Sequence, residues 1–108
     1  GAIGVERRQA DARAEAMLAA IHHHDTGLRL AAERSFLRRL DGSCDTPIAG
    51  LAVLEGDRLW LRGEILRPDG SEVITGDIRG GAADGVELGI ELAQRLLGQV
   101  KPGFFDRL

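Results

Sequence analysis

The chain has 108 residues, of which 44% are hydrophobic and 29% are charged, and its formal net charge is −3. This size and composition indicate a single globular domain with one modest core, and the acidic balance gives no reason to expect a nucleic-acid partner. The single cysteine is too few for an internal disulfide or a cysteine-based zinc site, and no apolar run approaches the roughly 20 residues that span a bilayer. We therefore expect a cytoplasmic protein in a reducing compartment, without membrane contact.

The first 24 residues predict a short extended piece and then a helix. Residues 1–6 begin without a methionine, which suggests a fragment of a longer protein or a processed chain. Asp11 is a candidate helix cap, and helical spacing relates the apolar residues Ala14, Met17, Leu18 and Ile21. Three histidines, residues 22–24, end this pattern. Adjacent side chains diverge whereas zinc needs convergent ligands, so we favour imidazoles that interact with the helix C-terminus over a metal site.

A second helix is predicted from Asp25 or Thr26 to Leu40. Its apolar stripe consists of Leu28, Ala31, Ala32, Phe36 and Leu40. The other faces carry Arg29, Glu33, Arg34, Arg38 and Arg39. An arginine-rich face can bind phosphate or carboxylate, but we interpret this one as a solvated or domain-facing surface.

The connection after this helix holds the only cysteine, Cys44. Gly42 allows a close backbone approach to a ligand, and Pro47 fixes its own φ angle and favours an extended residue before it. Loops between rigid elements often carry reactive groups. From the residue types alone, a buried structural thiol is the favoured interpretation of Cys44 and a reactive thiol is the alternative.

From residue 48 onward the pattern alternates with a period of two, which predicts three strands. The first is expected at residues 48–54 and the second at residues 58–66, whose apolar face consists of Leu59, Leu61 and Ile65. A type I turn at residues 67–70 leads to a third strand at residues 72–79. The short connections predict an antiparallel meander.

Trp60 lies on the polar face of the second strand, where it is either an interface anchor or a cover for a neighbouring strand. Asp84 is the candidate cap of a last helix that ends near Gly98. The main apolar stripe of this helix is predicted to be Val86, Ile90, Ala93 and Leu97, widened by Leu88, Leu92 and Leu96. The paired phenylalanines in the tail, residues 101–108, either dock on a surface or belong to an oligomer contact.

The predicted order is helix, helix, three antiparallel strands, helix. A three-stranded sheet is not stable with both faces exposed, so we predict a two-layer α+β domain with the helices packed on one face. The sequence shows no nucleophile elbow, no HExxH motif and no glycine-rich nucleotide loop. Motifs alone therefore identify no complete catalytic site.

Two segments of the chain resemble the family of porphobilinogen deaminase, also called hydroxymethylbilane synthase. Residues 30–49 are similar to its cofactor-attachment region, an Ala-Glu-Arg helix followed by a Leu-x-Gly-Gly-Cys-x-x-Pro-Ile loop. Residues 1–8 resemble the segment Gly-Ala-Ile-Gly-Ile-Glu-x-Arg that leads into its third domain. Residues 69–71 and the last helix fit its C-terminal part. The loop departs from the family pattern at Ser43, where glycine is usual.

The resemblance implies that Cys44 carries a dipyrromethane cofactor through a thioether, and that this primer starts the joining of four porphobilinogen molecules into hydroxymethylbilane with release of ammonia. It implies three further cofactor-binding residues, namely Gly1, Gly42 and Ser43. Residues 9–108 would be the C-terminal cofactor-attachment domain. Residues 1–8 would be the end of the preceding domain or a linker.

In this family the catalytic aspartate and the carboxylate-binding arginines come mainly from two preceding domains. We therefore expect no catalytic residue in this fragment, no activity from it alone, and an isolated Cys44 that is a free, accessible thiol without cofactor. The expected partners are porphobilinogen and those two domains, and a monomer is expected. The alternative function is a stand-alone α+β protein-binding module, in which Cys44 is structural and the face around Trp60 docks a protein.

Overall fold

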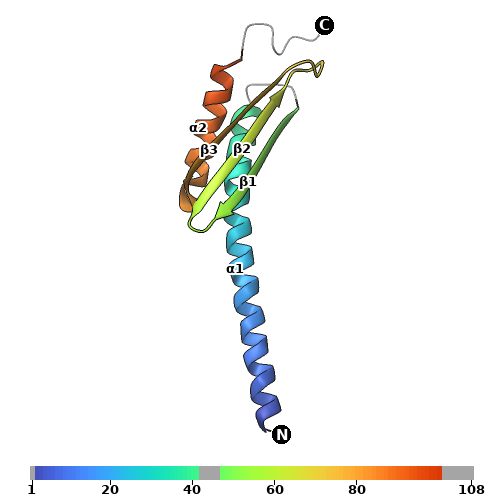
Figure 1. Ribbon diagram of the computed structural model, residues 1–108, viewed down its shortest axis with the longest axis vertical. Coiled ribbons are helices and arrows are strands. Elements are labelled where there is room, and N and C mark those ends of the chain that lie inside the picture. Colours follow the sequence, from blue (N-terminus) through green and yellow to red (C-terminus); the bar gives the residue numbers. More distant parts are fainter. Residues whose placement is uncertain (1, 42–46, 101–108) are drawn as a thin grey trace.

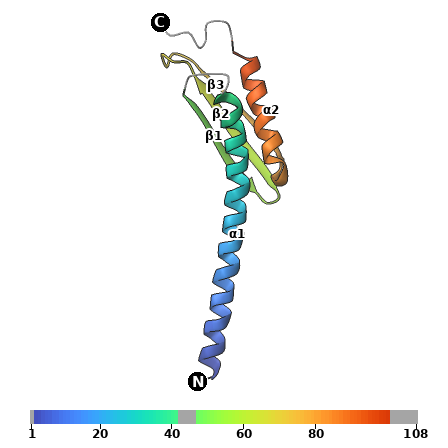
Figure 2. The same cartoon turned by 180° about the vertical axis from the view of Figure 1, so that it is seen from behind.

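The computed structural model describes residues 2–41 and 47–100, with side chains described from residue 11 onward. Its elements, in chain order, are α1 (Ala2–Asp41), β1 (Ile48–Glu55), β2 (Arg58–Leu66), β3 (Val73–Gly81), a 3-10 turn η1 (Ala82–Asp84) and α2 (Gly85–Gly98). Figures 1 and 2 show that both helices cover the same face of the sheet and that the N-terminal half of α1 projects beyond it. The predicted α+β class, with its antiparallel meander, is confirmed.

The N-terminal part differs from the sequence prediction. An extended piece at residues 1–6 and a break between two helices near Asp25 were expected, but one helix continues from Ala2 to Asp41. Ending a helix leaves backbone N–H and C=O groups unsatisfied, and residues 11–24 are exposed, so no packing in the described part of the chain compensates for such a break. The capping signals at Asp11 and Asp25 are therefore overridden, and Gly27 is accommodated in the helix at a cost of about 1 kcal/mol.

The apolar positions predicted for the projecting part of α1 remain exposed. Met17 is 66% exposed, Leu18 is 67% exposed and Ile21 is 55% exposed. The spacing predicted a buried face here, and the described part of the chain has no element that covers it. Within the described residues, no helix combines the length and the apolar character needed to cross a membrane.

The sheet follows the predicted alternation closely. Its order is β1-β2-β3, and in β2 the partners of Leu61 are Ala52 on one side and Ile78 on the other. The side chains of Leu59, Leu61 and Ile65 are fully buried against the helices. Period-two alternation sends these residues to one face, so the burial of the core strand is set by local pattern.

Phe36 of α1 is at the centre of the core. Its side chain is fully buried, and a Cβ atom at Gly63 of β2 would overlap its ring. The absence of a side chain at Gly63 therefore lets α1 lie directly on the sheet. The other buried apolar residues surround this contact: Ala32, Leu40, Ala52, Leu59, Leu61, Ile65, Ile78, Leu88, Leu92, Ala93 and Leu96.

Only half of the main stripe predicted for α2 lies in the core: Ala93 is buried and Leu97 packs against the core, but Val86 and Ile90 do not. Val86 is 51% exposed and Ile90 is 38% exposed, whereas the predicted secondary set, Leu88, Leu92 and Leu96, is buried. The cause is a close helix–helix contact at Gly89, where a Cβ atom would lie 2.7 Å from the Phe36 nitrogen and 2.8 Å from the Ala32 oxygen. This contact sets the rotation of α2, which leaves Val86 and Ile90 outside the core.

The two helical glycines Gly27 and Gly89 should respond in opposite directions to alanine. Gly89→Ala places a methyl group against the backbone of α1, which cannot move aside, so we expect a loss of about 1–3 kcal/mol in the free energy of unfolding. At Gly27, no neighbouring atom lies within 4 Å of the position that a methyl group would take. Gly27→Ala should therefore stabilise the protein by about 0.5–1 kcal/mol through helix propensity. Denaturant unfolding of both variants measures this, and a stabilised Gly89→Ala variant would contradict the close contact.

Candidate functional site

The residues predicted to bind a cofactor lie outside the described residues: Gly1, Gly42, Ser43 and Cys44. The structure does describe the two anchors of the cysteine-containing connection. On one side α1 ends at Asp41, directly after the fully buried Leu40. On the other side the Pro47 carbonyl accepts a hydrogen bond from the Leu66 N–H at 2.9 Å. Both ends of the connection are therefore held against the domain.

A carboxylate of α1 also holds the strand that follows the connection. Glu33 Oε2 accepts a hydrogen bond from the backbone N–H of Ala52 at 2.7 Å. Among residues 2–41 and 47–100, β1 has a neighbouring strand only on its β2 side, so this bond satisfies a donor that strand pairing leaves unused. Glu33 thus ties α1 to β1 across the elements that flank Cys44.

Removal of the Glu33 carboxylate should loosen this link. Glu33→Ala leaves the buried Ala52 N–H without its charged acceptor, and hydrogen bonds to charged groups contribute about 1.5–3 kcal/mol. We expect a loss in that range by thermal or denaturant unfolding, together with faster hydrogen exchange at the Ala52 amide. Glu33→Gln keeps an acceptor oxygen and should lose less. Equal losses in the two variants would show that the acceptor is not the important feature.

The turn between β2 and β3 begins at Arg67, next to Leu66, and so lies at the same end of the sheet as the Pro47 anchor. Its Gly70 N–H donates to the Arg67 carbonyl at 2.8 Å, as the predicted turn requires. Asp69 Oδ1 accepts hydrogen bonds from the Ser71 hydroxyl at 2.7 Å and from the Ser71 N–H at 2.9 Å. These bonds, with the hydroxyl contributing most and the Arg67 charge contributing less, hold the pKa of Asp69 below its ordinary value of 3.8.

The lowered pKa of Asp69 predicts that the stability of the folded domain depends on pH. Because the folded-state pKa lies below the unfolded one, the stabilisation is present above the unfolded pKa and is lost as the pH falls through the folded pKa. Ser71→Ala removes the hydroxyl donor and should raise the pKa of Asp69 toward its ordinary value. Ser71→Thr keeps a hydroxyl and should leave it low. A carboxyl-carbon NMR titration measures both, and an unchanged pKa in Ser71→Ala would contradict the assigned cause.

The histidines at residues 22–24 lie in the middle of α1 and not at a helix C-terminus, so that prediction is wrong, and they do not form a convergent cluster. The rings of His22 and His23 are 6.2 Å apart between centroids and inclined by 55°. Among the described side chains, no three potential ligands lie close enough to hold a metal ion. His22 instead borders a groove beside residues 51–54 of β1, together with Asp25 and Arg29.

Trp60 makes the contacts of a cross-strand cover on the open face of the sheet. Its Nε1–H donates to Asp77 Oδ2 at 2.7 Å. The guanidinium carbons of Arg79 and Arg62 lie 4.3 Å and 5.1 Å from the ring centroid, within the range of cation–π attraction. These contacts favour the cover over the interface anchor among the two interpretations of Trp60.

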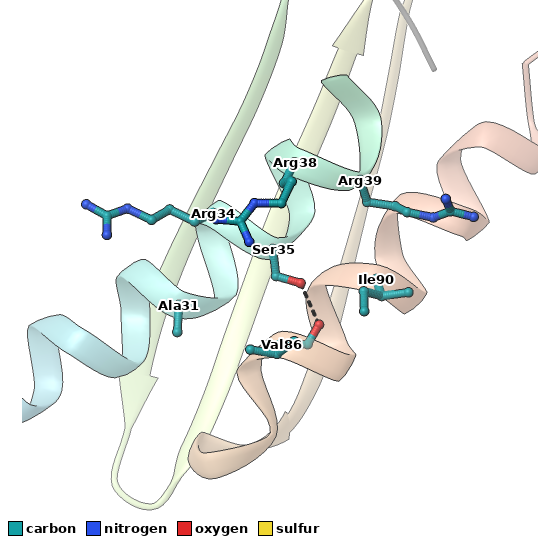
Figure 3. Close-up of a pocket in the computed structure, with 7 residues that line it drawn as sticks. All are labelled: Ala31, Arg34, Ser35, Arg38, Arg39, Val86 and Ile90. Atoms are coloured by element: carbon teal, nitrogen blue, oxygen red, sulfur yellow. Dashed lines mark hydrogen bonds between the residues drawn. The ribbon is translucent and has the colours of Figure 1, made fainter. Parts of the chain in front are cut away.

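A surface hollow of about 550 Å³ between α1 and α2 was not predicted from the sequence. Figure 3 shows the side chains that line it, which are Ala31, Arg34, Ser35, Arg38, Arg39, Val86 and Ile90. The Ser35 hydroxyl donates to the Val86 carbonyl at 2.6 Å and joins the two helices there. The arginines were recognised as a polar face, but Val86 and Ile90 had been assigned to the core, so the sequence contained no clear signal for the hollow.

The comparisons with known proteins decide the family. A profile described as "Porphobilinogen deaminase, C-terminal domain" matches residues 28–98. The chain belongs to this family. The porphobilinogen deaminase of Paracoccus denitrificans (strain Pd 1222) is 63% identical over 106 residues, which cover 98% of this chain and 34% of that protein. The chain therefore spans about a third of the length of this curated relative, and the family resemblance seen in the sequence is confirmed.

Proposed function

We propose that this chain is the cofactor-carrying C-terminal domain of a porphobilinogen deaminase, a transferase of tetrapyrrole and haem biosynthesis, and that Cys44 is the attachment point. The observation that carries the proposal is the family match over a chain whose only cysteine follows α1 and precedes β1. Bound dipyrromethane would supply the primer to which four porphobilinogen units are joined with loss of ammonia. Family membership favours this function over a stand-alone binding module.

The anchors around Cys44 suit a covalent attachment point. Leu40, next to the last residue of α1, is fully buried, and the Pro47 carbonyl accepts the Leu66 N–H directly before β1 begins. The hydrogen bond from the Ala52 N–H to Glu33 holds the middle of β1. The thioether itself is stable to hydrolysis, so an attached primer would survive repeated turnover.

The described residues provide no candidate catalytic pair. Within residues 11–41 and 47–100, no three potential metal ligands lie close enough to hold a metal ion. In this proposal the catalytic groups that act on porphobilinogen belong to the remaining two thirds of an enzyme like the Paracoccus relative.

A chimera tests the proposal directly. The last third of the Paracoccus porphobilinogen deaminase is replaced by this chain, which is 63% identical to it. We expect the chimera to convert porphobilinogen and to carry one added dipyrrole mass on the peptide that contains Cys44. Cys44→Ala should abolish both the turnover and the added mass, because alanine has no sulfur to form the thioether.

The unmodified chimera is the positive control, and a thermal melt of the Cys44→Ala chimera shows whether the substitution disturbs folding. The isolated chain should have the mass of its sequence alone, with one accessible thiol. A folded Cys44→Ala chimera that still turns over porphobilinogen would remove the role assigned to this residue.

A further inference from the structure

The hollow between α1 and α2 has two chemically different walls. α1 contributes Arg34 and Arg38, which lie four residues and so about one helical turn apart on the same face. α2 contributes Val86 and Ile90, whose side chains are 51% and 38% exposed. In Figure 3 the Arg38 side chain lies beside Ser35, on the side of Val86 and Ile90, whereas the Arg34 side chain extends outward from α1. One wall is therefore cationic and the other is apolar.

The positive charge of this hollow is not neutralised by neighbouring carboxylates. Within the described residues, neither Arg34 nor Arg38 has an acidic partner, and none of the side chains that line the hollow is acidic. Other arginines of the domain do have acidic partners, namely Arg67, Arg79 and Arg95. Arg39 also lines the hollow but already interacts elsewhere, so no role in binding is assigned to it. In a chain with more acidic than basic residues, this unpaired charge attracts an anion.

The shape of the hollow is held by contacts that a ligand does not need to create. The hydrogen bond from Ser35 to the Val86 carbonyl joins the two walls at 2.6 Å, and the close contact at Gly89 sets the rotation of α2. The same rotation keeps Val86 and Ile90 out of the core. A preformed site loses less entropy on binding than one that must be assembled.

We propose that this hollow binds a small organic polycarboxylate, with its carboxylates paired to Arg34 and Arg38 and its apolar body against Val86 and Ile90. Guanidinium groups bind carboxylates through paired hydrogen bonds. The volume of about 550 Å³ falls in the range of small-molecule sites. An inorganic anion would contact the arginines but would have no apolar body to pack against Val86 and Ile90. Binding here depends on these two walls and not on the role proposed for Cys44.

An NMR titration of the whole chain with benzene-1,3,5-tricarboxylate at low salt tests the proposal. This probe has three carboxylates on an apolar ring. We expect saturable shifts centred on the amides and side chains of Arg34, Arg38, Val86 and Ile90. Arg34→Gln or Arg38→Gln should weaken binding about tenfold, the effect of losing one charge-assisted hydrogen bond at an open site.

Two controls separate the contributions of the walls. Arg13→Gln makes the same charge change on the same helix, about 30 Å from Arg34 by helix rise, and should leave binding unchanged. Ile90→Thr should weaken binding of the tricarboxylate but not the weaker binding of inorganic phosphate. Equal affinities for phosphate and the tricarboxylate would overturn the proposal, as would an Arg13→Gln effect as large as that of Arg34→Gln. Neither result would affect the Cys44→Ala test of the chimera.

Discussion

The packing of Phe36 is the contact on which the rest of this domain depends. Its ring occupies the space that a side chain at Gly63 would fill, and its backbone nitrogen lies against Gly89 of α2. One residue of α1 is therefore in direct contact with both the sheet and the second helix. Interiors are packed as densely as organic crystals, so two missing side chains at these positions bring all three elements close together.

The positions of the functional candidates follow from this contact. Because α1 lies directly on the sheet, Glu33 reaches the Ala52 N–H and holds the middle of β1 against the helix. The connection that contains Cys44 is consequently anchored at both ends, which suits a residue that would carry a covalent group. The chain spans about a third of the length of the Paracoccus relative. The reaction proposed for the covalent group would also use the other two thirds of such an enzyme.

The same packing creates the hollow on the outer side of the helices. The approach of α2 at Gly89 turns Leu88 and Leu92 toward the sheet and leaves Val86 and Ile90 at the surface, beside Arg34. A site with apolar and cationic walls thus arises from helix rotation, and it lies apart from the short connection that carries the cysteine. The two proposed roles of the domain therefore have separate structural origins.

Local sequence determined the strands of the sheet and the motif in which the single cysteine lies. Strand alternation has a period of two, so Leu59, Leu61 and Ile65 could be assigned to the buried face before any tertiary contact was known. The family motif around Cys44 is likewise local, and the family comparisons confirm the resemblance. Only the tertiary structure decided the continuity of α1 through Gly27 and the rotation of α2. An apolar helix such as α2 presents several overlapping stripes, and the one that is buried depends on which face meets α1, a contact between residues distant in sequence.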